Sequence, residues 1–206
     1  MVRKIFLTIS ISALAIVLFA TKAYALTITP IRYEISGNPG QTLTEKMGLV
    51  NESNKTQTFY ASFANFEAQG DTGSPSFVDA KEGLGTWMTT EQASVTLAPG
   101  AQKEISFSIK IPKDAEPGGH FAAIFWGTSP GGGSPGQVSI GTKTGLLVLL
   151  SVNGDVKEQA GLVDFQLHNN KHFYKTLPVG FQYRFSNQGS DRVKPKGDIV
   201  IRSIFG

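Results

Sequence analysis

The sequence predicts an all-β protein, and three observations carry that prediction. Apolar side chains alternate with polar ones at a period of two, as in Ile31, Tyr33 and Ile35, which is the pattern of a half-buried strand. No segment after residue 25 carries an apolar stripe at helical spacing. Turn-forming Gly, Pro, Asn and Asp residues interrupt the apolar runs at short intervals. We therefore expect short strands arranged as a β-sandwich.

The expected strands follow one another along the chain. Ile105–Ile111 alternates as clearly as the first run, and Thr56–Phe66 is rich in aromatic residues. Ala93–Leu97 is a short strand that ends in a turn. His120–Trp126 is apolar on both faces, as in a central strand, and Gly145–Val152 is an apolar run that we expect to end the first domain.

The pattern divides the chain near Asn153. Residues 26–152 carry enough strands for one immunoglobulin-like β-sandwich. Residues 154–206 restart the alternation with only three expected strands, whereas such a sandwich needs about seven strands and roughly a hundred residues. We expect a second, incomplete immunoglobulin-like domain and interpret the chain as a fragment of a longer protein. Alone, residues 26–152 should unfold cooperatively and residues 154–206 should not.

The N-terminal segment predicts export. Arg3 and Lys4 precede the apolar run Ile5–Ala20, and Ala23-Tyr24-Ala25 has the small-x-small pattern that signal peptidase recognises. We expect residues 1–25 to be a signal peptide and the mature chain to begin at Leu26, at the cell surface or in the periplasm. The alternative is an uncleaved N-terminal anchor, and a C-terminal membrane anchor would lie outside this chain.

Charge and composition exclude several partner classes. The chain has 19 Lys and Arg and 16 Asp and Glu residues, and three of the basic residues lie within 1–25. The remainder, sixteen against sixteen, is neutral. A neutral chain without a basic cluster does not favour nucleic acid as a partner. Because the chain has no Cys, disulfides and Cys-based metal sites are excluded.

Several motifs of the first domain resemble a known family. They are Asn38–Gln41, Leu49–Lys55, Leu97–Gly100 and Ile111–Ile124. Together they look like the N-terminal domain of WxL-interacting cell-surface proteins, over about residues 26–152. The resemblance implies a β-sandwich at a bacterial surface with peptidoglycan binding as its role. The second domain looks like a generic immunoglobulin-like unit and departs from the host-binding domain of that family.

A more distant resemblance is to the first domain of periplasmic pilus chaperones. Those proteins use an Arg on the first strand and a Lys on the last strand to hold the C-terminal carboxylate of a subunit, whose strand is added to the sheet edge. Arg32 and Lys143 occupy comparable places in this sequence. The alternative is that both are solvated strand residues that protect an edge.

Signals for catalysis are thin. His120 begins an expected strand, while His168 and His172 flank an expected turn without nearby carboxylates. The sequence has neither a Gly-x-Ser-x-Gly elbow nor a phosphate-binding loop. We therefore expect no enzyme activity, no cofactor and no metal site.

Aromatic and acidic residues near a long polar segment offer one candidate ligand site. The segment Ala68–Gly85 is expected to be a loop, either a binding loop or a tolerated insertion. An aromatic face with nearby polar groups is how many wall-binding modules hold a sugar. The candidate ligand-binding residues are Trp87, Phe77, Asp71 and Asp79. Trp126 belongs to the same surface or, as we favour, to the core.

The sequence thus predicts an exported, non-catalytic binding or scaffolding protein of the cell envelope. Its expected partner is cell-wall glycan, such as peptidoglycan, or another envelope protein. The alternative is a chaperone-like protein that binds its partner by β-strand addition.

Overall fold

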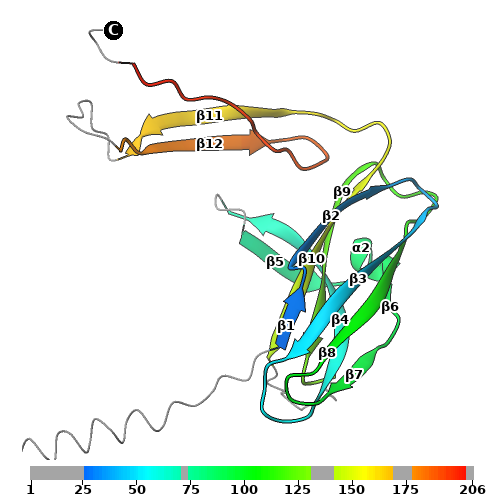
Figure 1. Ribbon diagram of the computed structural model, residues 1–206. Helices are drawn as coiled ribbons and strands as arrows, with labels where there is room; N and C mark the ends of the chain where they lie inside the picture. The colour runs from blue at the N-terminus through cyan, green and yellow to red at the C-terminus, as the bar shows by residue number, and fades with distance from the viewer. Residues whose placement is uncertain (1–25, 71–73, 131–141, 169–177, 203–206) are drawn as a thin grey trace, which may run out of the picture.

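The computed structural model describes residues 26–70, 74–130, 142–168 and 178–202 (Figure 1). Within these residues nearly all regular structure is β-strand, and two sheets pack face to face as a sandwich. The predicted all-β, immunoglobulin-like fold class is confirmed. The expected signal peptide lies outside the described residues, so it stays a prediction.

One sheet of the sandwich has four strands. Its order is β1 (Leu26–Thr29), β3 (Thr42–Asn51), β8 (Gln102–Lys110) and β6 (Met88–Thr90). All neighbouring strands in it are antiparallel. The chain leaves this sheet after β1, at the cis peptide bond between Thr29 and Pro30, and enters the other sheet as β2.

The facing sheet has six strands. Its order is β2 (Arg32–Gly37), β10 (Lys143–Val152), β9 (Gly118–Gly127) and β4 (Gln57–Gln69), with β5 (Ser74–Asp79) and β7 (Ser94–Leu97) both beside β4. β2 and β10 are parallel and the other pairs are antiparallel. β9 is therefore a central strand, as expected, and β10, the last strand of the sandwich in the sequence, is a central strand as well.

The core lies between the two sheets. Alternate residues of each strand point into it, so β8 contributes Ile105, Phe107 and Ile109 while its serines face outward. Trp126 is fully buried, which supports its assignment to the core. The single turn α2 (Leu84–Trp87) packs against β9 and β4 and buries Leu84.

The side chain of Asn51 connects two turns at one corner of the sandwich through hydrogen bonds. Its fully buried side-chain amide donates hydrogen bonds to the carbonyls of Lys55, Leu97 and Ala98, and its oxygen accepts from Ser53. This network satisfies backbone groups of two turns. Asn51 is therefore a structural residue, although it fits a glycosylation pattern with Ser53.

Two sequence expectations are wrong in detail. The segment Ala68–Gly85 is not one long loop, because β4 extends to Gln69 and β5 pairs with it. Cross-strand packing of Phe77 on Phe66 compensates for the poor strand propensity of the Ser-Pro-Ser start of β5. Residues 199–202, expected to begin a third strand of the second domain, are in no strand.

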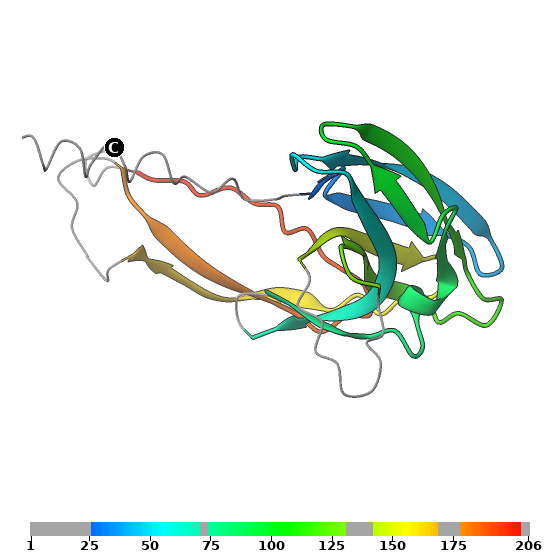
Figure 2. The same cartoon turned by 90° about the horizontal axis from the view of Figure 1, so that it is seen from below.

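Beyond the sandwich, β11 (Ala160–Leu167) and β12 (Phe181–Asn187) pair as a separate antiparallel ribbon. Figure 1 shows this ribbon projecting from one end of the sandwich, and Figure 2, turned by 90°, shows the two sheets of the sandwich as stacked layers. Phe165 and Tyr183 of the ribbon are about half exposed. Among the described residues, no helix is long and apolar enough to cross a membrane.

Candidate functional site

The centre of the outward face of the six-stranded sheet is largely apolar. Ile124 and Trp126 of β9 point into the core, so Phe121 and Phe125 lie on the opposite face. The strand register places the outward residues of β4, β5 and β10 beside them. We call this surface the phenylalanine face: Phe66, Phe77, Phe121, Phe125, Leu147 and Leu149, with Ala64, Ala123 and Gly145 between them.

Four aromatic rings of this face form a continuous chain of contacts. The ring centroids of Phe121 and Phe66 are 5.8 Å apart, those of Phe66 and Phe77 5.7 Å, and those of Phe77 and Phe125 5.0 Å. The two contacts of Phe77 are edge-to-face, an arrangement that aromatic quadrupoles favour. Phe77 is 44% exposed and the other three rings are partly buried, so the cluster is accessible to a partner.

Small residues determine where two of these rings lie. A Cβ atom on Gly145 would be 2.6 Å from the Phe125 ring, and one on Gly119 would be 2.7 Å from the Phe121 ring. Each ring therefore lies directly over a glycine of the neighbouring or same strand. The rings lie against the sheet, which makes the surface low and broad.

The outward face of the four-stranded sheet is polar instead. Thr44 of β3 lies opposite Ser108 of β8, with hydroxyl oxygens 3.3 Å apart. Lys46 and Glu104 on the same two strands form an exposed ion pair at 2.7 Å. The same sandwich thus has one polar outward face and one outward face with an apolar centre.

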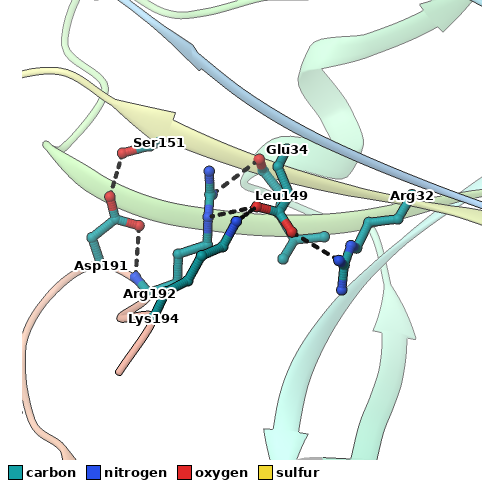
Figure 3. Close-up of polar contacts among 7 residues, drawn as sticks. All are labelled: Arg32, Glu34, Leu149, Ser151, Asp191, Arg192 and Lys194. Atoms are coloured by element: carbon teal, nitrogen blue, oxygen red, sulfur yellow. Dashed lines mark hydrogen bonds and ion pairs between the residues drawn. The ribbon is translucent and has the colours of Figure 1, made fainter. Parts of the chain in front are cut away.

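A polar network bounds one end of the phenylalanine face (Figure 3). The loop after β12 packs there, because the Gly119 N–H donates to the Ser190 carbonyl at 2.8 Å and the Ser151 hydroxyl donates to the Asp191 carboxylate. The guanidinium of Arg192 donates to the Leu149 carbonyl at 3.1 Å. These bonds attach the second unit of the chain to β9 and β10.

The carboxylate of Glu34 on β2 lies close to three cationic side chains in that network. Its carboxylate accepts a hydrogen bond from Lys194, lies 3.0 Å from the Arg32 guanidinium and 4.0 Å from that of Arg192 (Figure 3). The hydrogen bond from Lys194 is the largest influence holding the pKa of Glu34 below its ordinary value, and partial burial acts against it. The charges of Lys194, Arg32 and Arg192 lower this pKa further.

Arg32 and Lys143, the expected carboxylate-binding pair, lie on the same outward face but not side by side. Arg32 pairs in register with Leu147, four residues along β10 from Lys143. That offset corresponds to roughly 13 Å at about 3.3 Å per residue. Arg32 also already has a carboxylate partner in Glu34. Their proposed role stays a prediction.

The expected ligand-binding residues are divided between two places. Phe77 is on the phenylalanine face, and Asp79 lies on the same face at the end of β5, opposite Ala64. Trp87 is at the end of the sandwich in α2, partly buried against the core, with its ring 4.8 Å from that of His120. Asp71 lies outside the described residues. Trp87 and Phe77 therefore do not form one patch.

Histidine and acidic residues form no metal-binding cluster of three or more within the described part of the chain. His120 makes a 2.8 Å hydrogen bond to the Glu116 carbonyl through Nε2. A cavity of about 510 Å³ near the polar network lies between residues 156–160 and 191–194. Its lining mixes three cationic side chains with two carboxylates, so it suits no single charge.

Most of the phenylalanine face was missed as a site by sequence reasoning. The available signal was that His120–Trp126 is apolar on both faces, because Phe121 and Phe125 occupy the positions where an outward face carries polar residues. Phe66 and Phe77 belong to strands whose pairing the sequence did not reveal.

Comparisons with known proteins found structural similarity only. No family model matches the chain, and no curated protein matches its sequence. A PapD-like domain of human CEP192 matches with TM-score 0.45 and 12% identity, over 66% of this chain and 92% of that one. The class 5 fimbriae chaperone CfaA matches with TM-score 0.44 and 14% identity, over 81% and 68%. The E. coli chaperone DraB matches with TM-score 0.42 and 11% identity, over 78% and 86%.

Proposed function

We propose that this chain is an exported, non-catalytic module of the cell envelope that binds another protein through the phenylalanine face. The observation that carries the proposal is the contiguous set of four phenylalanine rings on the outward side of a sheet. Contiguous apolar patches of this kind on soluble proteins usually mark interaction sites. The N-terminal sequence pattern supports the proposed export.

A protein partner suits this face better than a sugar does. Sugar sites combine aromatic surfaces with several polar groups that converge on the hydroxyls. Here the positions between the rings are Ala64, Ala123 and Gly145, with Ser62 beside Phe125. The charged residues of this face, Arg32, Glu34, Lys143 and Asp79, lie at its margins. Aromatic residues surrounded by small apolar ones are typical of the centre of a protein interface.

The test is partner capture by matched variants. The affinity-tagged full chain is cross-linked in the envelope of the producing cells, and the attached proteins are quantified by mass spectrometry. Phe77→Ser and Phe125→Ser should each reduce capture about tenfold, the loss expected for a central aromatic contact. Ile31→Ser is the control, because Ile31 is 78% exposed but lies at the crossover between the sheets.

The outcomes separate the alternatives. Equal capture by Phe77→Ser, Phe125→Ser and Ile31→Ser would remove the proposal. Retained protein capture together with Trp87-dependent co-sedimentation with peptidoglycan would favour the glycan-binding role implied by the WxL-interacting resemblance instead.

A second candidate function is binding by strand addition, and the free side of β2 favours it. Among the described residues, β2 is hydrogen-bonded to β10 on one side and ends the sheet on the other. An extended partner segment at such an edge gains main-chain hydrogen bonds. In that case Arg32→Ala and Lys143→Ala should release the partner, while Phe125→Ser should leave capture near normal.

A further inference from the structure

One row of residues crosses the phenylalanine face with opposite charges at its two ends. The strand register aligns Arg32 of β2, Leu147 of β10, Ala123 of β9, Ala64 of β4 and Asp79 of β5. Four strand spacings of about 4.8 Å separate the ends by roughly 19 Å. β9 lies in the middle of this row. The row therefore has a cation at one edge, which also contacts Glu34 at 3.0 Å, a carboxylate at the other edge and apolar residues between them.

From this arrangement we infer that the partner of the phenylalanine face is a second copy of this chain. The inference rests on the proposed function and specifies its partner. The two copies pack face to face about a two-fold axis parallel to β9. Such an axis exchanges the two edges of the sheet, so Arg32 of each copy lies opposite Asp79 of the other. One interface then contains two identical charge pairs at its rim.

The central residues match under the same operation. The neighbouring row runs from Glu34 of β2 through Leu149, Phe121 and Phe66 to Phe77 of β5. Rotation about β9 places Phe66 of one copy over Leu149 of the other and Phe77 over the Arg32–Glu34 ion pair, while Phe121 and Phe125 lie near the axis and meet their own equivalents. Ala123 leaves space for rings of the opposite sheet, which packs about 10 Å away in β-sandwiches.

The size of the face predicts a weak dimer. Five strands at about 4.8 Å and seven residues at about 3.3 Å give a footprint of roughly 550 Å² on each copy. The loop after β12 already packs on the end of the face at Gly119 and Ser151, which reduces that area. A total near 1,000 Å² is at the lower end of specific interfaces. We therefore expect a dissociation constant in the micromolar range.

Sedimentation velocity on the purified full chain tests this inference, from about 1 to about 200 µM. The wild type should shift from monomer to dimer with concentration. We expect about tenfold weaker dimerisation from each of the single variants Phe77→Ser, Arg32→Asp and Asp79→Arg. The double variant that combines Arg32→Asp with Asp79→Arg should restore the dimer, because the charge pairs re-form with reversed charges. Lys110→Glu, on the polar outward face of β8, should change nothing.

The results distinguish this inference from the proposed function. A chain that stays monomeric at the highest concentration overturns the dimer, and Phe77-dependent capture of a different protein would leave the function standing. A dimer that the charge exchange does not restore overturns the two-fold arrangement. Melting curves of the three single variants, compared with the wild type, show whether any loss of dimer reflects unfolding. Recovery of the dimer in the double variant shows that the effect of the single charge changes comes from the charge pairs.

Discussion

The two outward faces of the sandwich differ although the two inward faces are alike. β8 and β10 each bury every second residue in the same core. On the outward side β8 carries Ser106 and Ser108, whereas β10 carries Leu147 and Leu149. Burial in the core explains the inward residues of both strands. It does not explain the outward leucines or the phenylalanines beside them.

This difference separates residues that maintain the fold from residues available for binding. The four-stranded sheet shows that this sandwich is compatible with hydroxyl and charged side chains on an outward face. An apolar outward face is therefore not a requirement of the fold. We interpret it as the functional side of the molecule.

The largest effect should come from the inward side of β9. Ile124 is fully buried, and Ile124→Ala should lower the free energy of unfolding by about 2 to 5 kcal/mol through lost burial and a cavity. Phe125→Ala, one residue later on the partly exposed face, should cost less. Urea denaturation of both variants provides the comparison. Equal losses would show that the phenylalanine face is itself core.

Substitution of one glycine on each outward face, Gly145 and Gly48, should affect partner capture differently. Gly145→Val places a side chain where the Phe125 ring lies, so it should displace the ring and cost about 1 to 3 kcal/mol. It should also reduce partner capture. Gly48→Val on the outward face of β3 meets the Thr29 hydroxyl at a similarly short distance and serves as the matched control. Capture should survive that substitution, and if both variants lose capture, the effect belongs to stability alone.

A smaller effect should follow acidification at the edge of the phenylalanine face. Because the pKa of Glu34 is lowered in the folded chain, its contribution is fully present above its ordinary value of 4.5 and is lost as the pH falls through the lowered pKa. The amide NMR signals of Arg192 and Lys194 should then move with a midpoint below 4.5. In Glu34→Gln this titration should be absent. Its persistence would show that Glu34 is not the titrating group.

The smallest effect is expected on the polar face. Lys46 and Glu104 are both about two-thirds exposed, and water and salt screen their attraction. Lys46→Ala should leave the melting temperature and partner capture unchanged within error. A clear loss of capture would place the binding surface on the wrong sheet.

Sequence reasoning predicted the fold because alternation records which side of each strand is buried. It identified β2 and β8 from their period-two patterns and β9 from a run that is apolar on both faces, and it placed Trp126 in the core. The β4–β5 hairpin was missed because Ser74-Pro75-Ser76 has low strand propensity. Pairing with the adjoining end of β4 overrides that propensity.

The candidate surface was harder to predict for a related reason. Phe66, Phe77, Phe121 and Phe125 meet only when three strands pair in one register, and alternation within a strand does not give that register. The contacts of Glu34 with Lys194 and Arg192 join residues far apart in sequence. Trp87 was predicted to bind a ligand together with Phe77, but its ring packs on His120 at the end of the sandwich.

Site-specific photo-cross-linking tests the central claim most directly. A photoreactive phenylalanine analogue replaces Phe77 on the phenylalanine face or Thr44 on the polar face, and the cells are irradiated intact. We predict a discrete cross-linked protein product from position 77 and none from position 44. Products of equal yield from both positions, or a product from position 44 alone, would contradict the assignment of binding to the phenylalanine face.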